Sequence, residues 1–126
     1  FWDSEANNPR VNIISFENNL IEICKKIIDS GAQKIFLNTN HPTLKKTHFN
    51  YQKESDNYNN AIRKAYDNLK PSKKIHLIDI DMNFRNAQKK DPNFISETLL
   101  VDGIHLSEFG HKKYFEIIVD VIKDFC

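Results

Sequence analysis

The sequence predicts an α/β fold in which helices cover a parallel sheet. Segments with helical and strand-like patterns alternate along the chain, in the order helix, strand, loop, helix, strand, loop, helix. Such alternation is typical of parallel sheets with helical crossovers. Both strand-like segments are short apolar runs, as in strands that are buried on both faces. Two strands are too few to bury a sheet, so we expect this chain of 126 residues to be part of a larger domain.

The first helix is predicted over residues 11–30 and the first strand over residues 34–39. Pro9 precedes this helix and Gly31 follows it, which is the usual order of start and stop residues. Because its apolar side chains recur at helical spacing, they form one stripe that should face the core. That stripe contains Ile13, Phe16, Leu20, Cys24, Ile27 and Ile28. Cys24 is therefore expected to be a buried core residue.

A polar segment separates this pair from the next helix and strand. Residues 43–57 show no clear period and are predicted to form a long loop. Apolar spacing predicts a helix over residues 58–69, which Pro71 stops, and a buried strand over residues 74–80. The segment 82–98 is expected to be irregular, with buried anchors at Phe84, Phe94 and Ile95.

Composition limits the classes of partner. With 18 basic and 17 acidic residues, the net charge of +1 indicates no nucleic acid and no anionic membrane surface as a partner. No apolar run reaches the ~20 residues of a transmembrane helix. The two cysteines predict no disulfide framework. Because the chain begins with neither an initiator Met nor a signal peptide, it is expected to be a fragment or a processed product, and the sequence indicates no compartment.

The residues best suited to catalysis lie near the C-terminus. Asp102 and His105 are three residues apart, a spacing that suits a general base with its own orienting carboxylate. Gly103 lets the backbone turn between them, and Ser107 is a candidate N-cap for the helix that follows. We therefore expect Asp102 to accept the Nδ1 proton of His105 and leave Nε2 facing outward. On spacing alone, a capping network or a surface ion pair is the commoner explanation.

The run D-G-I-H-L-S-E-F-G-H at residues 102–111 narrows these alternatives. Followed by an amphipathic helix over residues 108–125, it resembles the last sequence block of the SGNH (GDSL-type) hydrolases, a family of esterases and lipases. The resemblance implies a flavodoxin-like three-layer α/β/α sandwich with a five-stranded parallel sheet, of which this chain supplies the last two strands and flanking helices. It also implies that Asp102 and His105 are the acid and the base of a catalytic triad.

The resemblance extends over nearly the whole chain. The F-E-N-N-L run at residues 16–20 is similar to a helix pattern that follows the family's third block, G-x-N-D. On that alignment, residues 1–126 form a single domain, the C-terminal portion of an SGNH hydrolase domain. The nucleophilic Ser and the oxyanion hole would then lie N-terminal to this chain, in the remainder of the same domain. The fragment alone would be inactive or nearly so.

Other residues near the N-terminus match the family poorly. Asp3-Ser4 is similar to the end of the family's G-D-S motif, but Trp2 stands in place of the Gly and no strand is predicted before it. Asn7 and Asn8 lack the G-x-N-D context. These residues are therefore not assigned to the nucleophile or the oxyanion hole.

The resemblance implies a serine esterase or lipase-type hydrolase that cleaves an acyl or acetyl ester, with carbohydrate esters among the candidate substrates and no cofactor or metal. Asn40 and His41 follow the first strand at its carboxyl end, where open α/β sheets place ligands, and are expected to bind substrate. The alternative is a non-catalytic α/β interaction module, either an inactive SGNH-like fragment or a module that binds a partner through an open sheet edge.

Three further features are weaker candidates. Asp79 and Asp81 could form an oxygen-rich metal site with the Asp-x-x-His pair, but no recognised ligand spacing is present. Strand alternation would also point these two carboxylates to opposite faces. His48 is expected in an exposed loop, and His76 is expected to be a partly buried strand residue.

Overall fold

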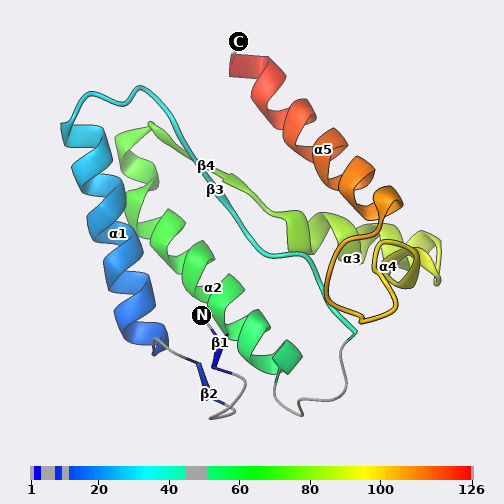
Figure 1. Cartoon of the computed structure of the whole chain (residues 1–126). Coiled ribbons are helices and arrows are strands. Elements are labelled where there is room, and N and C mark those ends of the chain that lie inside the picture. Colours follow the sequence, from blue (N-terminus) through cyan, green and yellow to red (C-terminus); the bar gives the residue numbers. More distant parts are fainter. Residues whose placement is uncertain (1, 4–7, 10–11, 45–50, 126) are drawn as a thin grey trace. The chain divides into compact units, whose positions relative to one another are not determined.

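A computed structural model describes residues 2–3, 8–9, 12–44 and 51–125 of the chain (Figure 1). The fold is mixed α/β with a parallel two-stranded sheet, as the sequence predicted. Contacts between Cα atoms divide the chain into two compact units. Unit 1 comprises Phe1–Thr39 and Lys53–Leu77, and unit 2 comprises Asn40–Gln52 and Ile78–Cys126.

Unit 1 is built mainly from two helices and two parallel strands. In chain order these are α1 (Ile13–Asp29), β3 (Ile35–Asn38), α2 (Tyr51–Leu69) and β4 (Ile75–Ile78), although the first two residues of α2 and the last of β4 fall in unit 2. A short antiparallel pair, β1 (Trp2–Asp3) and β2 (Asn8–Pro9), precedes them and was not predicted.

The ends of α1 follow from its sequence. Asn12 caps the start of the helix, because its side-chain oxygen accepts a hydrogen bond from the Ser15 N–H at 2.8 Å. Gly31 follows the helix with φ +108°, a backbone conformation that a residue with a Cβ rarely adopts. The predictions of α1 and β3 are thus confirmed to within two residues at each end.

The core of unit 1 lies between these helices and one face of the sheet. Alternate strand residues contribute to it, with Ile35 and Leu37 from β3, and Ile75 and Leu77 from β4. The helices supply the remainder: Phe16, Leu20, Ile21, Cys24, Ile28, Ile62, Tyr66 and Leu69. In unit 1, α1 and α2 therefore pack on the same sheet face.

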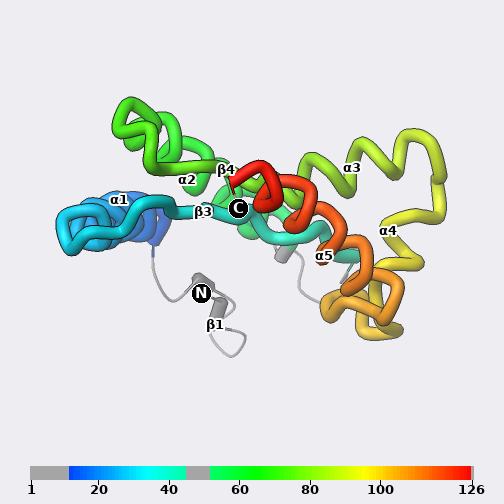
Figure 2. Tube along the Cα trace, turned by 90° about the horizontal axis from the view of Figure 1, so that it is seen from above, coloured from blue at the N-terminus to red at the C-terminus, as the bar shows by residue number. Residues whose placement is uncertain are grey.

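Two aromatic contacts define the two sides of this arrangement. Phe16 of α1 meets Tyr58 of α2 edge to face, with ring centroids 4.8 Å apart, and Figure 2 shows the two helices side by side. Phe36 and His76 occupy the alternate strand positions, and their rings lie 5.3 Å apart on the other sheet face. The predictions of a buried Cys24, which is 2% exposed, and a half-buried His76 are confirmed.

The start of α2 differs from the prediction. Residues 51–57 were expected in a loop, but the helix begins at Tyr51. The first two turns of α2 are polar, so no apolar residues at helical spacing indicate them. Even the buried position one turn before Tyr58 is a polar residue, Ser55. The predicted end is confirmed, since α2 stops at Leu69 and a 3₁₀ turn containing Pro71 follows.

The described residues of unit 2 form the α-helices α3 (Ile80–Lys90), α4 (Phe94–Glu97) and α5 (Glu108–Ile122). The expectation of irregular structure over residues 82–98 was therefore wrong. Strand β4 ends at Ile78, and Asp79 caps α3 by accepting a hydrogen bond from the Met82 N–H at 3.1 Å. The predicted anchors are nevertheless buried, and the rings of Phe84 and Phe94 meet edge to face at 5.5 Å.

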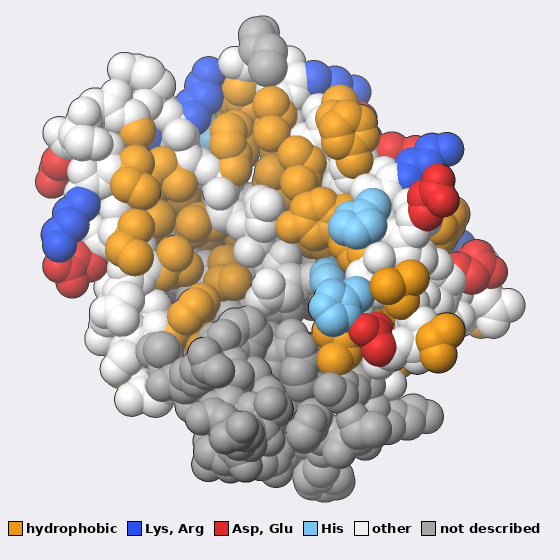
Figure 3. All heavy atoms as spheres, viewed as in Figure 1, with side chains coloured by type: hydrophobic (Ala, Val, Ile, Leu, Met, Phe, Trp, Pro, Cys, Tyr) orange, Lys and Arg blue, Asp and Glu red, His pale blue; other side chains and the backbone are white. Residues whose placement is uncertain are grey.

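Helix α5 confirms the prediction for the C-terminal segment, with a final 3₁₀ turn over Lys123–Phe125. Figure 3 shows hydrophobic side chains at the surface over α1 and over α5. Exposed large hydrophobic residues include Ile14 and Ile23 of α1 and Phe115 and Val119 of α5. Within the described residues, every helix is too short or too polar to cross a membrane.

Candidate active site

The turn before α5 brings Asp102 and His105 together. Gly103 has φ +73°, which lets the chain reverse between them. One carboxylate oxygen of Asp102, Oδ1, accepts the backbone N–H groups of Ile104 at 2.9 Å and His105 at 3.0 Å. The other, Oδ2, lies 2.5 Å from Nδ1 of His105. The carboxylate thus holds both the backbone and the ring of this turn.

This contact sets the tautomer of the imidazole. An ionised carboxylate can only accept, so Nδ1 of His105 carries the proton that joins it to Asp102. Nε2 then has a free lone pair, and 73% of the His105 side chain is exposed. Figure 3 shows histidine side chains at the surface over this turn, beside an acidic side chain. A ring held in this tautomer with an open Nε2 can act as a general base.

The same hydrogen bonds lower the pKa of the Asp102 carboxyl. Its value falls from 3.8 to about 2, first because of the hydrogen bond to the His105 ring and then because of the backbone N–H groups of Ile104 and His105. Asp102 is therefore ionised throughout the pH range in which a histidine base operates.

A second segment of unit 2 binds two backbone carbonyl groups of this turn. Nε2 of His41 lies 2.7 Å from the carbonyl oxygen of Ile104, and the Leu44 N–H donates to the Gly103 carbonyl at 2.8 Å. His41 is half-buried. Segment 41–44 thus donates hydrogen bonds to two successive backbone carbonyl groups, those of Gly103 and Ile104.

The residues after His105 anchor the turn to the rest of unit 2. Ser107 caps α5 by accepting the Gly110 N–H at 3.0 Å, which confirms the predicted N-cap. The Ser107 N–H donates to the Thr98 carbonyl at 2.8 Å. A Cβ on Gly110 would lie 2.0 Å from that same carbonyl oxygen, so only glycine lets α5 approach this closely.

The other predicted site residues have varied positions. Asn40 is half-buried next to His41, and the expectation that both bind substrate stays a prediction. Ser4, Asn7 and His48 lie outside the described residues.

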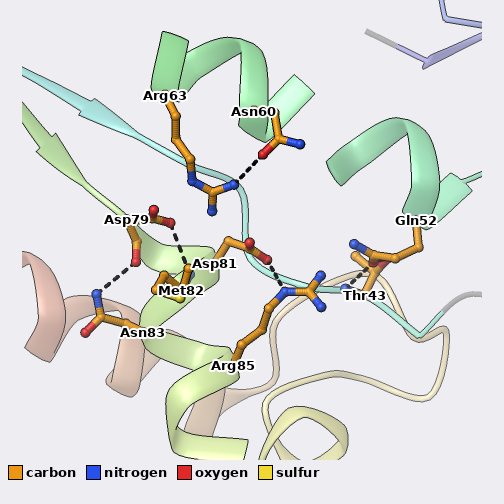
Figure 4. A network of polar contacts seen from close by, with 9 residues as sticks. All are labelled: Thr43, Gln52, Asn60, Arg63, Asp79, Asp81, Met82, Asn83 and Arg85. Carbon is orange, nitrogen blue, oxygen red and sulfur yellow. Dashed lines mark hydrogen bonds and ion pairs between the residues drawn. The ribbon is translucent and has the colours of Figure 1, made fainter. Parts of the chain in front are cut away.

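The interpretation of Asp79 and Asp81 as strand residues with opposed carboxylates was wrong. Asp79 caps α3, and Asp81 lies in its first turn, where its carboxylate pairs with Nε of Arg85 at 2.8 Å (Figure 4). Both carboxylates thus have structural partners. Among the described residues, no group of three or more Asp, Glu, His or Cys side chains gathers as metal ligands do.

The serine hydroxyls of unit 2 are engaged elsewhere. Ser96 donates to the Asn93 carbonyl at 2.9 Å, and Ser107 donates to the Glu97 carbonyl at 2.7 Å. In the described part of unit 2, no serine hydroxyl is therefore bound to Nε2 of His105.

Sequence reasoning missed the backbone partners of the turn. The contacts of His41, Leu44 and Thr98 join positions far apart in the chain, and no local pattern marks them. Gly110 did indicate a close contact in the sequence. Glycine is unfavourable inside a helix, so its presence there suggests that another part of the backbone packs closely against it.

Comparison with protein families identifies the class to which this chain belongs. A family model described as GDSL-like lipase/acylhydrolase matches residues 3–118. Because this match spans most of the chain, the protein belongs to the GDSL-like lipase/acylhydrolase family. A comparison of the sequence with curated proteins finds no significant match.

A solved structure shares the fold. The chain is similar to the crystal structure of a lipase/acylhydrolase from Enterococcus faecalis, with a TM-score of 0.65 and 20% sequence identity. The match covers 91% of this chain and 53% of that one, so the chain spans about half the length of that protein. At this identity the structural match shows a shared fold, and the family model shows the family.

Proposed function

We propose that Asp102 and His105 are the acid and the base of a serine esterase whose nucleophile and oxyanion hole lie N-terminal to this chain. Nε2 of His105 takes the proton of the serine hydroxyl as that oxygen attacks the ester carbonyl, and returns it to the departing alcohol. Water then attacks the acyl-enzyme in the same way, which releases the acid and restores the serine. The ionised Asp102 stabilises the imidazolium formed in each half of the reaction.

One observation carries this proposal: the Asp102 carboxylate binds Nδ1 of His105 while Nε2 stays open. A capping network alone needs only the backbone contacts of Oδ1 and leaves the ring free to rotate. Here the second carboxylate oxygen also binds the ring. Membership of the GDSL-like lipase/acylhydrolase family favours using this geometry for ester hydrolysis.

The substrate we propose is a small acyl or acetyl ester, with carbohydrate esters included. Asn40 is proposed to contact this substrate, because it follows β3 at the carboxyl end of a parallel strand, where ligands bind in open α/β sheets. The proposed reaction needs neither a metal nor an organic cofactor.

The test is hydrolysis of p-nitrophenyl acetate by the full-length gene product that contains this chain. His105→Ala should lower kcat by about 10²–10⁴-fold, because general-base catalysis contributes that much. His111→Ala is the matched control, since this exposed histidine lies on the surface of α5. It should retain the original rate.

Equal rates for the unsubstituted protein and His105→Ala would contradict the role proposed for this histidine. If both proteins also hydrolysed the ester no faster than buffer, the non-catalytic interaction module would be favoured instead. A large loss confined to His105→Ala would support the esterase.

A further inference from the structure

We propose that His41 is a positioning residue, which orients the catalytic turn by donating a hydrogen bond to the Ile104 carbonyl. This inference rests on the proposed role of His105 and adds a residue that no motif assigns. It also gives His41 a function different from the substrate contact expected from its position after β3.

The direction of this hydrogen bond is determined by its acceptor. A backbone carbonyl oxygen can only accept, so the 2.7 Å contact requires a proton on Nε2 of His41. That nitrogen is consequently unable to act as a base or to accept a hydrogen bond from substrate. His41 joins residues that are 63 positions apart in the chain.

The peptide held by His41 is the one that leads into His105. The Ile104 carbonyl carbon is bonded to the His105 nitrogen, whose N–H binds Asp102 Oδ1 at 3.0 Å. Rotation of this peptide about the axis through its two Cα atoms would turn the His105 N–H away from Asp102. It would also change the backbone dihedral angle at His105 that orients the side chain. His41 opposes such a rotation from the carbonyl side.

Hydrogen bonds of the neighbouring residues hold the segment that carries His41 in place. The Leu44 N–H holds the adjacent Gly103 carbonyl at 2.8 Å. Both the N–H and the hydroxyl of Thr43 donate to Oε1 of Gln52, at 2.8 Å and 2.7 Å (Figure 4). Pro42 and Thr43 are buried, and proline has a nearly constant φ. The donor of His41 is therefore presented from a segment that is itself held in place.

The arrangement explains how an exposed base can keep a defined orientation. The His105 side chain is 73% exposed, so packing restrains it little. Its orientation depends on the turn, whose carbonyl groups at Gly103 and Ile104 are bound by segment 41–44 and whose N–H groups are bound by Asp102. Loss of one donor should therefore misplace the imidazole without removing any catalytic atom.

The experiment compares His41→Gln and His41→Asn in the full-length gene product with p-nitrophenyl acetate. The amide nitrogen of Gln can reach the place of imidazole Nε2, whereas that of the shorter Asn cannot. We expect His41→Asn to lower kcat by about 10–100-fold with KM nearly unchanged, as for a misplaced catalytic group. His41→Gln should restore kcat to within a few-fold of the original.

A spectroscopic measurement tests the same inference without catalysis. In ¹⁵N-labelled protein, the His105 Nδ1–H signal should be sharp in the unsubstituted protein and in His41→Gln. In His41→Asn it should broaden or shift, because the ring leaves Asp102. His111→Gln, a matching change at an exposed histidine, should alter neither this signal nor kcat.

Two outcomes would overturn the inference. Unchanged kcat and an unchanged Nδ1–H signal in His41→Asn would show that the turn holds its shape without this donor. A raised KM with unchanged kcat in both variants would indicate that His41 contacts substrate and does not position the turn. Neither outcome affects the esterase proposal, which the comparison of His105→Ala with the unsubstituted protein tests separately.

Discussion

The core of unit 1 and the Asp102–His105 turn of unit 2 are maintained by different forces. In unit 1, α1 and α2 bury apolar side chains on one face of the β3–β4 sheet. In the turn, the side chains of Asp102 and His105 are exposed, and individual hydrogen bonds with Asp102, His41 and Leu44 hold its backbone. The Leu100 N–H adds one more, to the His105 carbonyl at 2.8 Å. Burial is non-directional and spread over many atoms, whereas each hydrogen bond of the turn orients one group. Stability and chemistry should therefore respond to different substitutions.

The largest effect on stability is expected in the core of unit 1. Ile62 is 6% exposed and packs in the same cluster as Cys24 and Leu37. Ile62→Ala should lower the free energy of unfolding by about 2–5 kcal/mol, because it removes buried methyl groups and leaves a cavity. Urea denaturation followed by circular dichroism measures this loss.

Lys64→Ala is the matched control for this core substitution, since Lys64 is exposed on the same helix. It should change the free energy of unfolding by no more than about 0.5 kcal/mol. Equal values for the two variants would mean that burial at this face does not stabilise unit 1.

A smaller loss is expected where α5 approaches Thr98. Gly110→Ala would gain about 0.5–1 kcal/mol of helix stability if the new methyl group met open space. Instead its Cβ would lie 2.0 Å from the Thr98 carbonyl oxygen, and relieving such an overlap costs about 1–3 kcal/mol. The cost of this overlap should exceed the gain in helix stability, so we expect Gly110→Ala to lower the free energy of unfolding. Lys112→Ala, an exposed neighbour on α5, is the control, and a Gly110→Ala protein as stable as that control would contradict the close approach.

The smallest effect should appear in the titration of Asp102. Its carboxyl should titrate near pH 2 instead of 3.8. Because its pKa is lower in the folded chain, the ionised form contributes stability above pH 3.8, and this contribution disappears as the pH falls toward 2. Carboxyl ¹³C NMR measures the midpoint. In His105→Ala the midpoint should rise toward 3.8, whereas an ordinary midpoint in the unsubstituted chain would refute the carboxylate–imidazole contact.

Prediction from sequence succeeded where apolar side chains repeat. Most of the stripe of α1, the short run of β3 and the C-terminal helix were predicted, because each element must bury one apolar face. Ile27 was expected to face the core but is 40% exposed near the end of α1. Helix α3 was missed because Asp79 and Asp81 were interpreted as strand residues. The missed signals were an N-cap at Asp79 and the Asp81–Arg85 pair four residues apart, which are polar features of a helix start.

By itself, the sequence determined the elements with apolar repeats, the N-cap of α5 and the local pairing of Asp102 with His105. All of these depend on interactions between residues a few positions apart. Only the tertiary structure decided that His41 and Leu44 bind the carbonyl groups of the turn, and that Gly110 lies against Thr98. The physical reason is that backbone carbonyl groups are the same in every residue, so the sequence cannot mark which distant donor will reach them.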